Sequence, residues 1–483
     1  MTAVLTGFIA YLVIVLFIGL LTAKQNKTQA DYLIGGRKLN PWVIAFSERA
    51  SGESAWLLLG MTGAALSVGL GETWTALGCV LGIIFSWLFI ARRLREDSGK
   101  YDALTLPEYF TQKFAKDSKS IQIIASVIII FFFTFYVAAQ FSGAGKVLNV
   151  TFGIPNFWGV LIGAGVILLY TMLGGFFAVA WTDLVQGIIM LGTLVILPIV
   201  GIIELSEAGK IGTLSISQAL AQQGADKASW VGGALGLGAV LFVINGLSWG
   251  LGYTGQPHLV LRYIAMRNPS DAKKATKIAI VWAVLAFTGS LLIGLVGLGL
   301  YGANEFGDPE KLMPIMATRL LPVWLAGIFI SGAIAAMMST ADSQILVATS
   351  AVTEDIYHRV MGKNPSQKTL VLISRVATLA IGLAALVLAL TTKELVFSMV
   401  SYAWGGLGAS FGPIIVLSLY WRKLNKQGVI AGMLAGSLTT FVWKNISTLQ
   451  SVVPERLAGY VVALFAVIIV TLATKPKSAT ADR

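Results

Sequence analysis

The sequence predicts an all-α integral membrane protein with about thirteen transmembrane helices. Its 483 residues are 56% apolar and only 12% charged, whereas soluble domains carry about 25% charged residues. Apolar runs of about 20 residues recur along the chain, long enough to cross about 30 Å of hydrocarbon as helices and too long for barrel strands. Low charge and run length together place the chain in the membrane class.

Each of these apolar runs is expected to form one membrane-spanning helix. The longest polar connections, 92–119 and 302–322, are too short to hold an inserted soluble domain. The first run is interpreted as a helix rather than a signal peptide, because no basic residue precedes it. The expected spans are 4–23, 41–66, 71–91, 120–147, 155–176, 183–203, 229–258, 276–301, 323–350, 368–391, 395–420, 427–446 and 457–473.

The net charge of +12 is an orientation signal rather than a nucleic-acid footprint. Basic residues gather in alternate connections, while the intervening ones are short or acidic, such as 204–207 and 305–310. Because cytoplasmic loops carry the excess of Lys and Arg, the N-terminus is expected outside and the C-terminus in the cytoplasm. The basic connections contain Lys24, Lys27, Arg37, Lys38; Arg92, Arg93, Arg95, Lys100, Lys113, Lys116, Lys119; Arg262, Arg267, Lys273, Lys274, Lys277; Arg359, Lys363, Lys368; Arg422, Lys423, Lys426; and Lys475, Lys477, Arg483.

The sequence contains few of the residues that form disulfides or bind transition metals. The single cysteine, Cys79, excludes a disulfide framework and a cysteine-based metal site. With only His258 and His358, a histidine metal cluster is not expected either.

The span 41–66 carries charges where a membrane helix normally excludes them. Glu48, Arg49 and Glu53 lie around Gly52 in the run from Ser47 to Trp56. A charge at the bilayer centre costs about 2.5–3.5 kcal/mol on insertion scales, so such residues generally face a cavity. Glycine also weakens the helix there. We therefore expect this segment to break and to line a substrate cavity.

The role of these three charges has two interpretations, one structural and one functional. Arg49 and Glu53, four residues apart, can pair with each other at the cavity wall, or Glu48 and Arg49 can snorkel toward an interface. In the functional reading Arg49 binds a substrate carboxylate and Glu53 an ammonium, as suits a zwitterionic amino acid. If Glu48 instead occupies Arg49, Glu53 favours a cationic substrate.

The span 229–258 shows a second interruption. Glycines recur at 246, 250, 252 and 255, and Pro257 follows Gln256. Glycine eases unwinding and proline removes a backbone donor, so carbonyls become free for a cation; close helix packing is the alternative. The two broken spans are five spans apart, as in five-plus-five inverted repeats with a binding site at the midplane.

The ninth span places oxygen ligands on one face. Ala336, Ser339, Thr340 and Ser343 recur at spacings of three and four, which suits a sodium ion, although such hydroxyls often bond their own backbone. Asp342 adds an intramembrane carboxylate, a functional candidate by default. Asp183 is either a first-turn acid that complements a helix dipole or a second such carboxylate.

Several runs, taken in order, resemble the sodium/solute symporter family, and most of all its bacterial sodium/proline symporters. They extend from about residue 30 to 445, nearly the whole chain. They are Asp31-Tyr-Leu-Ile-Gly-Gly-Arg37, Leu104-Thr-Leu-Pro-Glu-Tyr-Phe110, Gly174-Gly-Phe-Phe-Ala-Val-Ala-Trp-Thr-Asp183, Trp249-Gly-Leu-Gly-Tyr-Thr-Gly-Gln-Pro-His258, Met338-Ser-Thr340, Thr353-Glu-Asp-Ile-Tyr357 and Ser401-Tyr-Ala-Trp-Gly-Gly-Leu-Gly-Ala-Ser-Phe-Gly-Pro413.

The resemblance implies a LeuT-like core that alternates its access and imports a small solute with sodium across the bacterial inner membrane. The implied units are a peripheral helix and loop at 1–40, inverted repeats at 41–203 and 204–420, and two further helices with a cytoplasmic tail at 421–483. The implied sodium ligands are the backbone oxygens of Ala50, Glu53 and Ala336 and the hydroxyls of Ser339 and Thr340. A second cation site, present in some members, maps onto Asp183, Ser339, Asp342 and Ser343.

The expected substrate pocket combines the charged segment with the contacts that the resemblance implies on the seventh and fourth spans. Its residues are Arg49, Ser51, Gly52, Glu53, Ser54, Trp56, Tyr136, Gln140, Trp249, Tyr253, Gln256 and Pro257. We expect an amino acid such as proline as substrate, the lipid bilayer as surroundings, and neither nucleic acid nor an obligatory protein partner.

Three departures from the proline symporters bear on specificity and coupling. Gly52 stands where they have an acidic residue important for sodium, and the next residue is Glu53. Glu48 and Arg49 replace small residues, and Asp342 replaces a hydroxyl. If Asp183 and Asp342 face each other, a cation must separate them or one must take up a proton. Proton coupling, a cationic or carboxylate substrate, and a sensor that binds without transport are the alternatives to sodium-coupled import; no nucleophile–base pair points to an enzyme.

Overall fold

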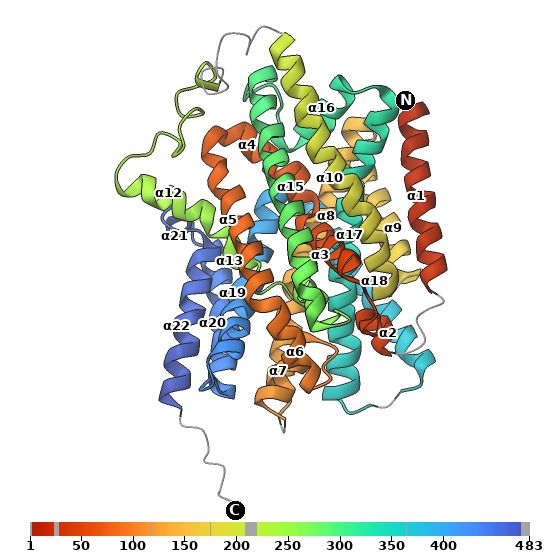
Figure 1. Ribbon diagram of the computed structural model, residues 1–483, viewed down its shortest axis with the longest axis vertical. Coiled ribbons are helices and arrows are strands. Elements are labelled where there is room, and N and C mark those ends of the chain that lie inside the picture. Colours follow the sequence, from red (N-terminus) through yellow and green to blue (C-terminus); the bar gives the residue numbers. More distant parts are fainter. Residues whose placement is uncertain are drawn as a thin grey trace, which may run out of the picture.

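The computed structural model describes residues 2–23, 29–116, 118–173, 175–207, 220–363 and 365–474. Within these residues the regular elements are helices, as the sequence predicts, apart from one isolated bridge between Leu39 and Met266. Most of the long helices run along the long axis of the molecule and form one bundle (Figure 1).

The first half of the bundle contains long helices interrupted by short 3₁₀ or π segments, labelled η. The elements are α1 (Thr2–Ala23), α2 (Gln29–Ile34), η1 (Gly35–Arg37), α3 (Pro41–Ala55), η2 (Trp56–Met61), α4 (Thr62–Val68), η3 (Gly69–Glu72), α5 (Thr73–Phe85), η4 (Ser86–Ala91), α6 (Arg92–Lys100), α7 (Leu106–Phe114), α8 (Ser120–Phe152), α9 (Asn156–Leu173) and α10 (Phe176–Glu207).

The second half begins with a helix in pieces. Its elements are α12 (Leu237–Leu247), α13 (Trp249–Gly252), α14 (Pro257–Ile264), η5 (Pro269–Asp271), α15 (Ala272–Tyr301), η6 (Pro309–Lys311), α16 (Leu312–Leu320), α17 (Val323–Ser350), η7 (Ala351–Val360), α18 (Gln367–Thr391), α19 (Val396–Tyr420), α20 (Lys426–Lys444), α21 (Ser447–Gln450) and α22 (Glu455–Ala473).

Among the described residues, eight helical stretches are long and apolar enough to cross a membrane, and nine if the bent pair Leu237–Gly252 and Pro257–Ile264 counts as one span. One of them, Pro41–Lys100, has 60 residues and leaves the helical conformation at Gly69 (φ 80°, ψ −143°). Leu5–Gly19 and Asn156–Met172 are shorter apolar helices. The count of thirteen spans, the inverted repeat and the unit boundaries stay predictions.

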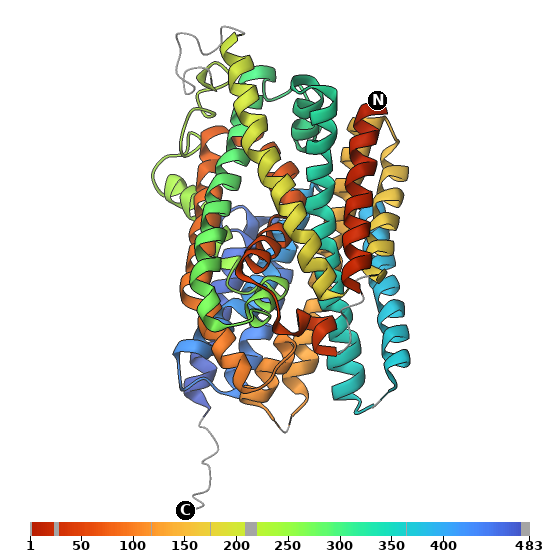
Figure 2. The same cartoon turned by 45° about the vertical axis from the view of Figure 1, so that its right-hand side comes forward.

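Helix α3 lies in the middle of the bundle and carries the charged segment (Figure 2). It packs against α10, α15 and α17, and against the half-helix α14. Asn40 caps its first turn by accepting hydrogen bonds from the N–H groups of Trp42 and Val43, and Pro41 occupies the first helical position, where its missing N–H costs nothing. Every residue from Ser47 to Met61 is buried, so whatever these polar side chains bind must be inside the protein.

Two helix boundaries differ from the predicted spans. Helix α10 begins at Phe176, so Asp183 lies two turns inside it and the first-turn interpretation of this acid is wrong. The broken span does not end at residue 258: α14 continues to Ile264. Proline at the start of α14 begins a new half-helix instead of ending the old one, which moves Arg262 from the expected basic loop into the buried core.

Candidate functional site

Both predicted breaks are present, but the first lies two residues later than expected. Gly52 stays in the helix, where an added Cβ would come within 3.3 Å of Leu259. The residue that leaves the helical region is Ser54 (φ 29°, ψ −167°), and a π-helical segment follows from Trp56. Gly52 therefore allows close packing on α14, and the helix is broken beside it at a serine, which adopts this conformation less readily than glycine.

The predicted sodium ligands of α3 and α17 come together. The Ser339 hydroxyl donates to the carbonyls of Ala50 (3.0 Å) and Ala336 (3.1 Å), and the Thr340 hydroxyl donates to the carbonyl of Ser51 (2.9 Å). These hydroxyl and carbonyl oxygens are the hard ligands that suit a sodium ion. The Glu53 carbonyl, also expected there, accepts the N–H of Trp56.

Glu48, Arg49 and Glu53 form one ionic cluster, with each side chain 0% exposed. Arg49 donates through Nε to Glu48 Oε2 (2.5 Å), through Nη2 to Glu48 Oε1, and through Nη1 to Glu53 (2.7 Å). The pairing predicted for Arg49 and Glu53 is thus confirmed, and snorkelling of Glu48 and Arg49 to an interface is wrong. All three guanidinium nitrogens are engaged, so in this conformation Arg49 holds its own acids instead of a substrate carboxylate.

The two acids of this cluster are satisfied to different degrees. Glu48 also accepts hydrogen bonds from Trp87 Nε1 (2.9 Å) and the Tyr263 hydroxyl (3.2 Å). Glu53 accepts one further donor, the Tyr253 hydroxyl, at 3.0 Å from Oε2. Because Glu53 Oε2 receives only that bond among the described residues, this oxygen keeps capacity for another donor.

Aromatic rings surround the two breaks. Trp56 stacks on Trp249 with centroids 4.8 Å apart, and Tyr253 meets Trp404 edge to face at 4.6 Å. Two more predicted pocket residues contact this region: the ring of Tyr136 contacts that of Trp404, and the side-chain oxygen of Gln140 accepts the N–H of Ala55 at 3.0 Å.

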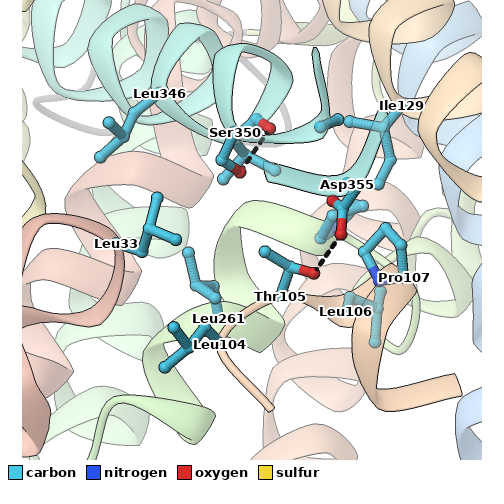
Figure 3. A pocket seen from close by; sticks show the side chains of 13 residues that line it. Leu33, Leu104, Thr105, Leu106, Pro107, Ile129, Leu261, Leu346, Ser350 and Asp355 are labelled. Atoms are coloured by element: carbon cyan, nitrogen blue, oxygen red, sulfur yellow. Dashed lines mark hydrogen bonds between the residues drawn. The ribbon is translucent and has the colours of Figure 1, made fainter. Parts of the chain in front are cut away.

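Gln256 lies at the second break, and one of the two polar groups of its side-chain amide forms hydrogen bonds. Its Nε2 donates to the carbonyl of Trp404 (2.9 Å), whereas the buried Oε1 has no hydrogen-bond partner among the described residues. Pro257 begins α14 and also lines a narrow cavity between α14, α17 and the 104–107 segment, where Thr105 donates to Asp355 at 2.8 Å (Figure 3). Pro257 thus lies both at the second break and in the lining of this cavity.

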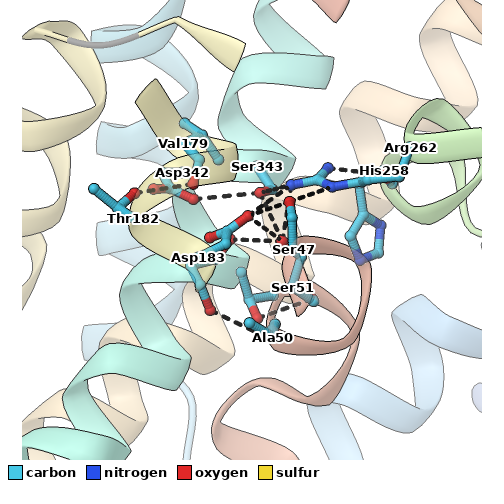
Figure 4. Close-up of polar contacts among 12 residues, drawn as sticks. Ser47, Ala50, Ser51, Val179, Thr182, Asp183, His258, Arg262, Asp342 and Ser343 are labelled. Atoms are coloured by element: carbon cyan, nitrogen blue, oxygen red, sulfur yellow. Dashed lines mark hydrogen bonds and ion pairs between the residues drawn. The ribbon is translucent and has the colours of Figure 1, made fainter. Parts of the chain in front are cut away.

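The predicted second cation site is occupied by a side chain. Arg262 reaches from α14 toward Asp183 and Ser343 (Figure 4) and pairs with Asp183 Oδ2 at 3.1 Å. Asp342 lies beside this group and accepts a hydrogen bond from Ser343 at 3.3 Å. The sequence predicts that, if Asp183 and Asp342 face each other, a cation lies between them or one of them is protonated. At Asp183 the structure places a cation, the guanidinium of Arg262.

Comparisons with known proteins identify the family. A model of the sodium:solute symporter family matches residues 32–436. The chain belongs to this family. It is 36% identical over 472 residues to the high-affinity proline transporter PutP of Bacillus subtilis, covering 97% of this chain and 98% of that protein. It is 35% identical over 489 residues to the sodium/proline symporter of Escherichia coli, covering 100% and 95%.

Solved structures show the same fold. A Na⁺-coupled sialic acid symporter in a substrate-bound, outward-open state has a TM-score of 0.80 at 20% identity, over 98% of both chains. MhsT in complex with L-phenylalanine has a TM-score of 0.51 at 16% identity, over 90% of this chain and 98% of that one. The chain is therefore a membrane transporter of this symporter family and not an enzyme.

Sequence reasoning missed several residues of the site. Trp87 and Trp404 lie inside predicted spans, where aromatic residues are common, and Tyr263 lies in the connection predicted after residue 258. The sequence predicts Arg262 in a basic connection. The signal that could have placed it is Pro257, since a half-helix that begins there carries residue 262 about 7.5 Å further along its axis.

Proposed function

We propose that this protein imports an amino acid such as proline together with sodium, by alternating access, across the bacterial inner membrane. The observation that carries this is the meeting of Ser339 and Thr340 on α17 with the carbonyls of Ala50 and Ser51 on α3, in a chain whose relatives are proline transporters. A sodium ion there would bridge the two helices and favour one conformation.

Substrate is proposed to bind beside the two breaks, with its ammonium on Glu53. Glu53 has a free acceptor position, whereas each guanidinium nitrogen of Arg49 already donates to Glu48 or Glu53. Trp56, Trp249 and Tyr136 would pack against the apolar part of the substrate, and Ser51, Gly52, Ser54, Gln140, Tyr253, Gln256 and Pro257 would complete the pocket.

A cationic substrate is the second candidate. Two carboxylates and one guanidinium leave the Glu48–Arg49–Glu53 cluster with one negative charge in excess, which favours a ligand of positive charge. Glu48 does bind Arg49, which is the condition under which the sequence favours a cationic substrate.

We further propose that the N-terminus lies outside and the C-terminus in the cytoplasm. Helix α1 begins at one end of the bundle and α22 ends at the other (Figure 1). The basic segments around α2, α6 and α7 share the end at which α22 stops, as the positive-inside rule requires of one cytoplasmic face. A second coupling cation, Na⁺ or H⁺, would act at Asp342 and Asp183 if one is used.

Binding to purified protein tests this function. Tryptophan fluorescence is followed while three ligands are titrated with and without sodium: proline, a second amino acid without net charge, and arginine. We expect proline binding to strengthen at least about tenfold with sodium, since the linkage of two bound ligands is reciprocal. Ser339→Ala should abolish this sodium effect, whereas Ser437→Ala, which removes a hydroxyl bonded only within α20, should keep it.

Two results would change the proposal. Tight binding of arginine and not of proline would select the cationic substrate. Binding that follows pH and ignores sodium would contradict the assigned sodium site.

A further inference from the structure

Arg262 is the least expected charge in the core. Its side chain is 0% exposed and lies 5.1 Å over the ring of Phe176. Nη1 donates to the carbonyl of His258 at 2.7 Å, which ties the guanidinium to its own half-helix. The remaining nitrogens point to the acceptors of three other helices.

Those acceptors are the residues expected to bind a second cation, together with their neighbours on α3. Nη2 donates to Ser343 (2.5 Å) and Ser51 (2.8 Å) and pairs with Asp183 (3.1 Å). Nε donates to Ser47 at 3.2 Å, and Ser47 donates in turn to Asp183 at 2.6 Å. The hydroxyls of this set and Asp183 Oδ2 therefore face a guanidinium, whereas the buried Asp183 Oδ1 and Asp342 Oδ2 have no hydrogen-bond partner among the described residues. Nη2 of Arg262 lies between Asp183 and Ser343, two of the residues that a second sodium ion would bind.

Charge counting leads to the same conclusion. Asp183, Asp342 and Arg262 carry a net charge of −1, which one monovalent cation neutralises. Asp342 follows Ser339 by three residues on α17, about 4.5 Å along the helix axis, and has no ion pair among the described residues. A sodium ion at Ser339 and Thr340 would complete the neutralisation, and a second ion would leave a buried positive charge, which is unfavourable.

We propose that Arg262 acts as a fixed cation that takes the place of a second sodium ion and thereby sets the coupling ratio at one sodium per substrate. A side chain cannot be released into the cytoplasm with the substrate, so it contributes charge to the site without carrying charge across the membrane. The proposal rests on the proposed sodium coupling, and Arg262 is a positioning residue in it, since it acts through Asp183 and Ser343.

The test counts bound sodium and needs no substrate, so it can fail independently of the assignment of proline. Equilibrium binding of ²²Na⁺ to purified protein should give about one ion per wild-type molecule. Arg262→Met removes the charge at similar length and should bind about two, because the cluster then carries −2. Arg262→Lys keeps the charge and should stay at about one.

Two further variants keep the test decisive. Asp183→Asn added to Arg262→Met should return the count to about one, since the freed carboxylate is gone. If Arg262→Met fails to fold, wild type and Asp183→Asn suffice: one ion in wild type and about none in Asp183→Asn, where Arg262 and Asp342 already cancel, supports the proposal. One ion in Asp183→Asn would contradict the charge count. Two ions in wild type, or one ion in a folded Arg262→Met protein, would overturn it.

Discussion

Arg49 and Arg262 are both fully buried, and they neutralise buried carboxylates in different ways. Arg49 binds Glu48 and Glu53, which belong to its own helix, so its ion pairs lie within six consecutive positions of α3. Arg262 binds acceptors on α3, α10 and α17. A local cluster can move as a unit, whereas a cluster that bridges four helices must break when those helices separate. We therefore propose that the first cluster persists in every transport state, and that the second forms only where α14 is packed against α3.

The largest effect should come from breaking the local cluster. Arg49→Ala leaves two adjacent buried carboxylates without their cation, and removing one partner of a buried pair costs about 3–5 kcal/mol. We expect a large fall in thermal stability, measured by unfolding of the purified protein in detergent. Arg49→Met combined with Glu48→Gln and Glu53→Gln should be milder, because no charge is stranded; equal losses would show that the charges are not what matters.

The next effect separates the two acids of the same cluster. Glu53→Gln should weaken amino-acid binding by roughly 10- to 100-fold, as expected for loss of a charge-assisted hydrogen bond of about 1.5–3 kcal/mol. Glu48→Gln is the matched control, since Glu48 is already satisfied by Arg49, Trp87 and Tyr263. Titration of proline at saturating sodium measures both, and a stronger effect from Glu48 would place the ammonium elsewhere.

The smallest effect tests a single hydrogen bond at the cluster's edge. Trp87→Phe keeps a ring but removes the Nε1 donor to Glu48, which should cost about 1 kcal/mol of stability and leave substrate affinity unchanged. Trp42→Phe on the half-exposed Trp42 (50%) provides the comparison and should be neutral. A neutral Trp87→Phe would mean that Arg49 alone satisfies Glu48.

The sequence predicts the surroundings of Arg49 but not those of Arg262. Glu48, Arg49 and Glu53 are close in sequence, so a helix brings them together whatever the rest of the chain does. Ser339 and Thr340 were also found, because hydroxyls and small residues share one face of an uninterrupted helix. Both readings rest on local periodicity.

The position of Arg262 could not be found in this way. Its partners lie 79 to 215 residues away along the chain, and only the tertiary fold joins them. Its neighbourhood is also rich in loop charges, which hides one buried arginine among exposed ones. The close approach of Gly52 to Leu259 is likewise a tertiary contact that local sequence does not show, and the break falls at Ser54 instead.

Transport itself tests the central claim most directly. Labelled proline is offered to proteoliposomes under an inward sodium gradient, with wild type, Ser339→Ala and Ser437→Ala measured side by side. The account predicts accumulation by wild type and Ser437→Ala that collapses when the gradient is dissipated, and none by Ser339→Ala. Accumulation that is the same without sodium, or that survives in Ser339→Ala, would contradict it.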